Sequence, residues 1–369
     1  MARSNVSVEV GGRTLKLTNL DKVLYPETGF TKGEVIDYYV TVADALLPHL
    51  ADRLLTRKRW PDGTGAESFF EKNTPRGTPE FVRTVSMAEH GDDGVEYVVG
   101  DDLPTLVWLA NLAALELHVP QWKVGPRGGP QHADLLVFDL DPGPPATVIE
   151  CCDVALGLRE RLGADGLTAF PKTSGGLGAQ LYVPIEPTTS RQTSAYAKQL
   201  AEELAAALPE LVVAAMDKRV RRSKVFIDWS QNNAAKTTIA PYSLRGRSQP
   251  TVSTPVTWDE VASAKTVADL VFCTDDVVAR IAADDPVTVL DGKGIIVTKF
   301  VDGGRPSAGS PAVWSEMGEL LGRLDMLPAA GGAVARDGGA EEHDGGFHVG
   351  RPKEDLAAAM GFLVSVEDK

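Results

Sequence analysis

The chain contains only three cysteines among its 369 residues, and none of them forms a CxxC pair. Cys151 and Cys152 are adjacent, whereas Cys273 lies far away in the sequence. Disulfide frameworks and cysteine zinc sites both need several cysteines at regular spacings. The sequence therefore supports neither, and we expect no zinc.

Long apolar runs are also missing. No stretch approaches the roughly 20 consecutive apolar residues that a membrane-spanning helix needs, and residues 1–10 contain no apolar signal core. We therefore expect a cytoplasmic protein with no membrane partner.

Positive charge is scarce, since 37 Lys and Arg face 51 Asp and Glu, for a net charge of −14. This excess of acid argues against a protein that coats nucleic acid nonspecifically. Two local basic clusters nevertheless occur, one at residues 57–59 before Trp60 and one of five cations within residues 218–224. Each is either a solvated charged face or part of a focused basic groove.

The order of apolar and polar segments predicts an α+β or mixed α/β fold, because strands are interrupted by helices and neighbouring strands can pair as hairpins. Thr31 and Glu34 fit a capping box that begins a helix, which we expect Pro48 to close. The apolar segment 106–117 predicts a further helix that ends at His118.

The character of the chain changes near its C-terminal fifth. Residues 1–292 read as one catalytic unit, whereas Gly and Ala accumulate beyond that point. For residues 293–369 we expect a flexible linker and a C-terminal tail, with one helix near residues 313–324.

Two carboxylates stand at the end of an apolar strand predicted over residues 134–140. Asp139 and Asp141 are two residues apart, so a strand places both on one face with Cα atoms about 7 Å apart. Two carboxylates on one face repel each other unless a cation lies between them. The phrase therefore indicates a Mg²⁺ or Mn²⁺ site.

Two other interpretations of this phrase remain open. Asp141-Pro142-Gly143 is ordinary turn chemistry, in which Asp139 only caps the following helix. A hydrophobic strand ending in DxD also resembles the nucleophile loop of haloacid-dehalogenase-type phosphatases. That family expects Gly and then Thr after the second Asp, whereas this chain has Pro142 and Gly143, which counts against a DxD phosphatase.

A third carboxylate, Asp228, lies in the apolar strand predicted over residues 225–229. Polar residues suited to phosphates follow it: Gln231, Asn232, Lys236, Thr237, Thr238, Arg245 and Arg247. A buried ion pair of Asp228 with Lys236 or Arg245 is the purely structural explanation, and it does not conflict with catalysis.

Six segments, in order, resemble the polymerase domain of bacterial end-joining DNA ligase D, a branch of the archaeo-eukaryotic primase superfamily. The similarity runs from near the N-terminus to about residue 290. The segments are LTNLDKVLYP (residues 17–26), RKRWPDG (57–63), FFEK (69–72), ELHVPQW (116–122), VFDLDPG (137–143) and residues 228–247. Because no nucleotidyl-lysine motif is visible, the chain is similar to a stand-alone polymerase relative.

The resemblance implies a primase-polymerase fold, in which two mixed α/β modules meet around a central groove. It also implies template-dependent nucleotidyl transfer onto a DNA 3′-hydroxyl with two Mn²⁺ or Mg²⁺ ions, in gap filling, end joining or excision repair. The implied partners are DNA gaps or ends that carry a 5′-phosphate, nucleoside triphosphates, a separate DNA ligase and an end-binding protein of the Ku type.

The resemblance also implies roles for individual residues. The metals would be held by Asp139, Asp141 and Asp228. The incoming nucleotide would be lined by Lys58, His118, Ser174, Gln231, Lys236 and Arg245. The 5′-phosphate of the downstream strand would be bound by Asn19, Lys22 and Lys32, and DNA would pack against Phe69 and Phe70.

The glycine-rich loop departs from the family pattern, which is close to S-G-G-K-G-x-H. Here it reads SGGLGAQ over residues 174–180, so Leu177 stands where the family has lysine and Gln180 where it has histidine. Backbone N–H groups can still cradle a phosphate, but Gln180 carries no charge. The departure keeps a second hypothesis open, that of a DNA-end-binding and synapsis module with weakened or lost catalysis.

Overall fold

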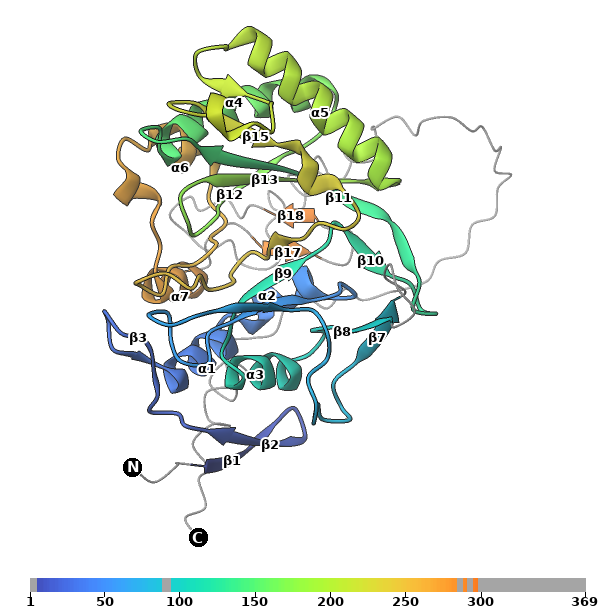
Figure 1. The fold of residues 1–369 in the computed structure, drawn as a ribbon, viewed down its shortest axis with the longest axis vertical. Helices are drawn as coiled ribbons and strands as arrows, with labels where there is room; N and C mark the ends of the chain where they lie inside the picture. The colour runs from blue at the N-terminus through green and yellow to red at the C-terminus, as the bar shows by residue number, and fades with distance from the viewer. Residues whose placement is uncertain (1–4, 88–93, 284–287, 291–294, 298–369) are drawn as a thin grey trace, which may run out of the picture. The chain divides into compact units, whose positions relative to one another are not determined.

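A 13-residue strand, β11 (Pro130–Pro142), organises the larger sheet of the computed structural model, which describes residues 5–87, 94–283, 288–290 and 295–297 (Figure 1). The six-stranded sheet runs β12-β13-β11-β15-β14, with β10 also paired to β11. The partners are β10 (Trp122–Val124), β12 (Phe170–Thr173), β13 (Ala179–Thr188), β14 (Val212–Val213) and β15 (Val225–Asp228).

The two faces of β11 have different surroundings, because successive side chains of a strand point to opposite faces. Leu136, Phe138 and Leu140 are buried in one apolar core. Asp139 and Asp141 therefore lie on the opposite face. The apolar residues of this strand fix the register that presents its two carboxylates away from that core.

Helices cover the apolar face of this sheet. They are α4 (Val148–Ala164) and α5 (Ser190–Ala207), with the short α6 (Trp258–Ser263) beside α4 (Figure 1). Each begins with a threonine capping box, such as Thr147 with Glu150 at the start of α4. Their apolar side chains share one core with β11, β13 and β15.

A second module is built mainly from the first half of the chain. Its sheet runs β16 (Thr238–Ile239), β9 (Ala114–Val119), β5 (Thr56–Arg59) and β6 (Phe69–Glu71). Its helices are α1 (Lys32–Thr41), α2 (Ala43–Leu50) and α3 (Leu103–Asn111). Their buried residues form a separate apolar core, and Phe272 packs against both cores.

The remaining elements are short. Antiparallel pairs are formed by β1 (Asn5–Val10) with β2 (Arg13–Thr18), β3 (Val23–Tyr25) with β4 (Phe30–Thr31), β7 (Thr84–Met87) with β8 (Val95–Val98), and β17 (Thr288–Leu290) with β18 (Ile295–Val297). The helical elements are η1 (Lys218–Val220), η2 (Trp229–Asn232), η3 (Val267–Leu270) and α7 (Thr274–Ala282). Within the described part of the chain, no helix combines the length and apolar character needed to cross a bilayer.

The segment after β16 joins the two modules. The Tyr25 hydroxyl donates to the Arg245 carbonyl over 2.9 Å, and the Thr251 hydroxyl donates to the Gly175 carbonyl over 2.7 Å. Gly246 packs so closely on Trp60 that an added Cβ would lie 2.1 Å from the indole. The segment therefore needs glycine there, and it contacts the glycine-rich loop of one module and the N-terminal strands of the other.

The structure confirms one predicted helix cap and corrects two predicted helix ends. The capping box of Thr31 and Glu34 is present, but Pro48 lies inside α2 rather than closing a helix, because the break falls at Val42. The helix predicted up to His118 ends at Asn111, and residues 114–119 form β9 instead. The chain turns at Ala113, which has a φ of 55°.

The linker predicted from residue 293 lies, apart from residues 295–297, outside the described residues, as do the tail and the helix near 313–324.

Candidate active site

Three carboxylates meet at the centre of the larger sheet. Asp139 on β11 is directly opposite Asp228 on the antiparallel strand β15, and Asp141 lies two residues further along the same face. One carboxylate oxygen from each residue lies within 4.8 Å of the others. The structure thus brings together the three acidic residues that the sequence singled out.

The electrostatics of this cluster are unfavourable without a cation. Burial, reinforced by the charge of Asp141, raises the pKa of Asp139 to about 7. Burial and the charge of Asp228 also raise the pKa of Asp141, while Arg221 opposes this. Convergent carboxylate oxygens with raised pKa values suit a hard divalent ion such as Mg²⁺ or Mn²⁺, so the residues present fit such an ion.

Two glutamine side chains orient the carboxylates. Gln180 Nε2 donates to Asp139 Oδ1 and Gln231 Nε2 donates to Asp228 Oδ2, both over 2.9 Å. The Oε1 atoms of both glutamines are buried and accept no hydrogen bond from the protein. Gln180, which replaces the family histidine, thus holds a carboxylate of the cluster, and Gln231, predicted at the nucleotide, does the same.

The glycine-rich loop lies beside the cluster, between β12 and β13. Ser174 Oγ accepts hydrogen bonds from the Gly176 and Gly178 amides, at 3.1 and 3.2 Å. Gly175 has a φ of 63°, and a Cβ on it would collide with the Val252 backbone, so only glycine fits. The Leu177 side chain is 66% exposed and packs into neither core.

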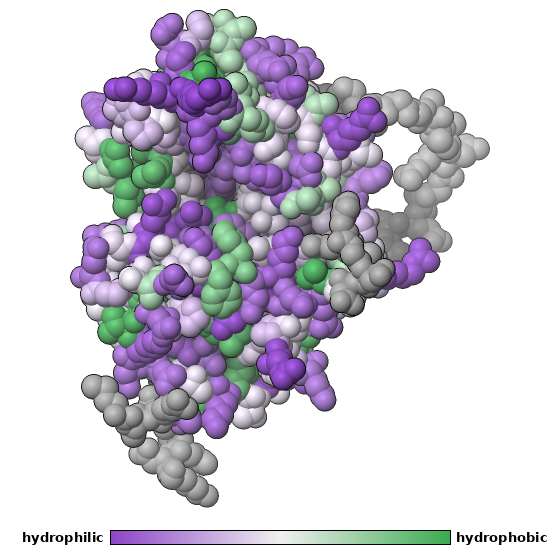
Figure 2. Space-filling model, in the orientation of Figure 1, coloured by the Kyte–Doolittle hydropathy of each residue, from purple (hydrophilic) through white to green (hydrophobic). Residues whose placement is uncertain are grey.

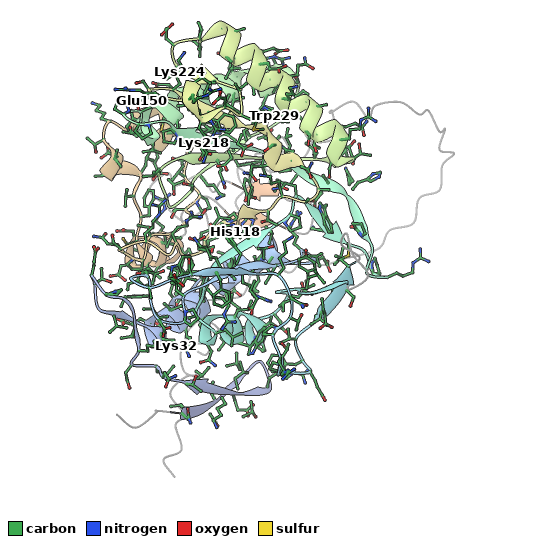
Figure 3. The ribbon with its side chains drawn as sticks, in the orientation of Figure 1. Lys32, His118, Glu150, Lys218, Lys224 and Trp229 are labelled. Atoms are coloured by element: carbon green, nitrogen blue, oxygen red, sulfur yellow. The ribbon has the colours of Figure 1, made fainter. Side chains whose placement is uncertain are left out.

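A second wall of the site comes from β5, β6 and β9. His118 and Glu116 lie two residues apart on one face of β9, with His118 Nε2 at 2.9 Å from Glu116 Oε2. The Phe70 ring lies edge-on to His118 with centroids 5.7 Å apart, and the Lys58 ammonium lies 5.2 Å from the centre of the same ring. Figure 3 shows His118 near the middle of the described part of the molecule.

Glu116 organises this wall, although no role was predicted for it from the sequence. It accepts from the Gly246 amide at 3.1 Å and lies 3.5 Å from Arg245 Nε. Burial alone would raise its pKa, but the hydrogen bond to His118 and the charge of Arg245 lower the pKa to about 2. Burial lowers the pKa of His118, and Glu116 opposes that shift. The i, i+2 spacing of Glu116 and His118 was the available signal.

Lys172 is a second residue without a predicted role. It is buried, faces Gln180 across β12 and β13, and donates to Ser253 Oγ over 2.5 Å. Burial lowers its pKa well below the usual value, and the nearby charge of Asp139 opposes this. A lysine inside the short strand that precedes the glycine-rich loop was the signal that pointed to it.

The three residues predicted to bind the 5′-phosphate of DNA are also close together. Asn19 has a φ of 56° and its carbonyl accepts the Lys22 amide, while the Lys22 carbonyl accepts the Lys32 amide. The Lys22 ammonium pairs with Asp62 over 2.7 Å, and the Lys32 ammonium donates to the Thr18 carbonyl over 2.5 Å. Burial and the neighbouring Lys22 lower the pKa of Lys32 to about 8.

The outer surface of the site carries aromatic side chains. Phe69 and Phe70 are 45% and 61% exposed, although both belong to a strand. Lys236 is exposed as well. Hydrophilic side chains dominate the visible surface between the two modules (Figure 2). Exposed rings beside cations are typical of surfaces on which bases stack.

The two basic clusters lie in different surroundings. Within residues 57–59, Arg57 is fully buried and Arg59 pairs with Glu71, so neither belongs to a solvated charged face. In the second cluster, Arg221 stacks on Phe226 with its guanidinium 3.4 Å from the ring centre, and Phe226 pairs with Asp141 across the sheet. Arg221 is thus the cation of that cluster that lies near the carboxylates.

Comparison with known proteins gives consistent results. The family model described as "LigD, primase-polymerase domain" matches residues 31–287. The "Multifunctional non-homologous end joining protein LigD" of Mycolicibacterium smegmatis is 46% identical over 281 residues, which cover 74% of this chain and 37% of that protein. The "Bifunctional non-homologous end joining protein LigD" of Bacillus subtilis is 37% identical over 269 residues, or 72% of this chain and 42% of that protein.

A solved structure agrees with these sequence matches. It is described as the polymerase domain of Mycobacterium tuberculosis ligase D in complex with DNA. It has a TM-score of 0.69 and 45% identity, and the match covers 73% of this chain and 95% of that one. The chain spans less than half the length of the curated relatives described above. The comparisons support neither a phosphatase nor a catalytically silent end-binding module.

Proposed function

Since the chain belongs to the LigD primase-polymerase domain family, we propose that it adds nucleotides to DNA 3′ ends at gaps and breaks, as a template-dependent polymerase of end joining or excision repair. In the reaction, the 3′ oxygen forms a bond to the α-phosphorus of a nucleoside triphosphate, the hydroxyl proton is released, and the bond to pyrophosphate breaks.

The observation that carries this proposal is the convergence of Asp139, Asp141 and Asp228 beside the glycine-rich loop. These three residues would hold two Mn²⁺ or Mg²⁺ ions. When bound, such ions polarise the α-phosphate and offset the negative charge of the departing pyrophosphate. The amides of Gln180 and Gln231 keep the carboxylates oriented before any ion arrives.

The rest of the site would hold the substrates. We assign the incoming nucleotide to Lys58, His118, Ser174, Gln231, Lys236 and Arg245. Glu116 positions two of these residues through its contacts with His118 and Arg245. DNA would pack against the Phe69 and Phe70 pair, whose exposed rings can stack on any base.

The DNA end would be recognised by the N-terminal module. We propose that Asn19, Lys22 and Lys32 bind the 5′-phosphate of the downstream strand at a gap. Lys32 begins α1, so the helix N-terminus adds its partial positive charge to the two ammonium groups. The phosphate would replace Asp62 as the partner of Lys22.

A separate ligase and a Ku-type end-binding protein are the partners we propose at breaks in bacterial chromosomal DNA, at the nucleoid.

Primer extension tests the proposal. The full chain is mixed with a gapped, 5′-phosphorylated template, with Mn²⁺ or Mg²⁺, and with ribonucleotides or deoxyribonucleotides. We expect addition of the nucleotide complementary to the template in at least one of these mixtures. Binding of the gapped DNA without any extension under all of them would instead favour the end-binding and synapsis module, which the loss of the loop lysine at Leu177 motivates.

A further inference from the structure

A row of polar side chains crosses four neighbouring strands of the larger sheet. Lys172 on β12 is directly opposite Gln180 on β13, and Gln180 is opposite Asp139 on β11. Asp139 is in turn opposite Asp228 on β15. Residues directly opposite each other on paired strands lie on the same face of a sheet. Gln180 therefore stands on the face of the carboxylate cluster, between a buried lysine and the first carboxylate.

The Gln180 side chain is almost completely enclosed. It is 3% exposed, and its Nε2 atom donates to Asp139 Oδ1 over 2.9 Å. Its Oε1 atom is buried and accepts no hydrogen bond from the described protein groups. A buried acceptor gains stability from any partner that reaches it, because it has lost its contact with bulk water. The Gln180 carbonyl oxygen is thus available to an ion at the cluster or to a water that the ion carries.

The donor atoms at the cluster are all oxygens. Within the part of the chain that the structure describes, no histidine or cysteine belongs to the group formed by Asp139, Asp141 and Asp228. Gln180 adds only a further oxygen, since the nitrogen of a glutamine amide is a donor of hydrogen bonds and not an acceptor. Carboxylate and carbonyl oxygens suit Mg²⁺ and Mn²⁺, whereas imidazole suits Ni²⁺ and Zn²⁺. The composition of the cluster therefore favours the first pair of ions.

Position 180 is where this composition can change. The terminal nitrogen of Gln180 already reaches a carboxylate oxygen of Asp139, so a histidine at the same position, as in the family pattern, would bring an imidazole to the cluster. An imidazole supplies a nitrogen ligand when neutral and a positive charge when protonated, and that charge would lie opposite Lys172. The glutamine amide supplies neither.

We propose that Gln180 determines which ion the carboxylate cluster selects. By placing a neutral amide where an imidazole could stand, it keeps the donor set free of nitrogen and favours Mg²⁺ and Mn²⁺ over Ni²⁺ and Zn²⁺. The inference rests on the proposed function, because it concerns the metal centre of that same site. It makes the glutamine at this position a change of ion preference rather than a sign of lost catalysis.

Ion competition at pH 8 tests this assignment on the full chain. Electron paramagnetic resonance of free Mn²⁺ gives the affinity for Mn²⁺, and displacement of bound Mn²⁺ by Mg²⁺ or Ni²⁺ gives the affinities for those ions. We expect Gln180→His to raise the affinity for Ni²⁺ relative to Mn²⁺ by about tenfold or more, because it adds a nitrogen ligand. Gln180→Met should weaken binding of Mn²⁺ and Mg²⁺ by about tenfold, as the loss of a residue that supports a metal ligand does.

Two variants serve as controls. Gln121 is also a buried glutamine whose Oε1 accepts no hydrogen bond, but its Nε2 donates to Thr238 Oγ1 instead of to a carboxylate. Gln121→Met should therefore leave the affinities for these ions unchanged. Arg247→Ala, which removes an exposed cation from the segment after β16, should leave them unchanged as well.

The outcomes separate this inference from the proposed function. An equal preference between Ni²⁺ and Mn²⁺ in the wild type and in Gln180→His would overturn the inference, and so would wild-type Mn²⁺ affinity in Gln180→Met. If the melting curve shows that Gln180→Met does not fold, Gln180→His alone decides. Ion selection that depends on Gln180, in a protein that never extends a primer, would overturn the proposed function and leave the inference standing.

Discussion

The two larger sheets of the protein differ in how their buried charges are paired. On the sheet of β5, β6 and β9, Arg57 and Arg59 share Glu71, at 3.2 and 3.0 Å, and Glu116 contacts His118. On the sheet of β11 and β15, three carboxylates converge instead. The first region has its charges matched by its own side chains, whereas in the second the pKa values of Asp139 and Asp141 stay raised although Lys172 and Arg221 lie nearby.

This difference indicates where ligands act. A region whose charges are already paired needs no ligand to neutralise them, so we expect its side chains to keep their positions when substrate binds. A cluster of like charges is costly until an ion binds, so its stability and its chemistry depend on that ion.

Removing a carboxylate should have the largest effect. Asp139→Ala or Asp228→Ala should lower the rate of nucleotide addition at least about a hundredfold, because each removes a ligand of the metals. Binding of gapped DNA, measured by gel shift, should survive. Asp153→Ala, an exposed substitution on α4, is the control and should extend normally. Undiminished primer extension by either active-site variant would show that the cluster is structural.

The lysines predicted to bind the 5′-phosphate should affect the affinity for gapped DNA rather than the rate of nucleotide addition. Lys22→Ala combined with Lys32→Met should abolish the preference for a 5′-phosphorylated gap over a 5′-hydroxyl gap, which we expect to be about tenfold at low salt. The preference of the wild type should shrink as salt rises, because part of it comes from counterion release. Met keeps the buried volume of Lys32.

Competition between the two gaps in a gel shift measures this preference. The exposed Lys198→Ala on α5 should retain it in full. If the wild type binds both gaps equally at low salt, the lysines are ordinary structural or surface cations.

The stability of the metal-free protein should depend on pH through the raised pKa of Asp139. Its pKa in the folded chain is about 7, above the ordinary value of 3.8, so the folded state holds a proton that the unfolded state releases. This group therefore stabilises the metal-free protein at low pH, and the contribution is lost as pH rises from about 4 through 7. Thermal melting in EDTA should show the loss, and Asp139→Asn should lack it.

Added Mn²⁺ should reverse that trend, because a metal needs the deprotonated carboxylate. We expect Mn²⁺ to raise the melting temperature of the wild type more at pH 8 than at pH 6. An equal rise at both values in the wild type and in Asp139→Asn would place the ion elsewhere.

The smallest effect is expected from the C-terminal residues. Deleting residues 303–369 should leave primer extension and the melting temperature nearly unchanged, because their Gly- and Ala-rich composition predicts little shared core. Both regions compared above lie within residues 56–228, so the contrast between them should persist in the truncated chain. Aggregation of that chain, or a far lower melting temperature, would show that the deleted residues pack against the body.

The spacing of Asp139 and Asp141 made part of this site readable in the sequence. Two residues apart on a predicted strand, they were expected on one face, and the structure agrees. The proximity of Asp228 was not available from spacing, since it depends on the pairing of β15 with β11, which places Asp228 opposite Asp139 although 88 residues lie between them in the sequence. Resemblance to a known family supplied that contact.

Other features depended on tertiary contacts that no local pattern encodes. The turn at Ala113 converts the end of a predicted helix into β9, which gives Glu116 and His118 a common face. The burial of Lys32 against Thr18 is one such feature, since no sequence pattern signalled that this lysine lies in the interior. The approach of Arg247 to Gly176 depends on a segment folded across both modules.

Binding of Mn²⁺ to the full chain at pH 8, followed by electron paramagnetic resonance, tests the central claim most directly. The claim is that the three convergent carboxylates form the metal centre of a nucleotidyltransferase. We predict tight Mn²⁺ binding by the wild type and by Arg247→Ala, and a large loss in Asp139→Ala and in Asp228→Ala. Equal Mn²⁺ binding by all four proteins would contradict the claim.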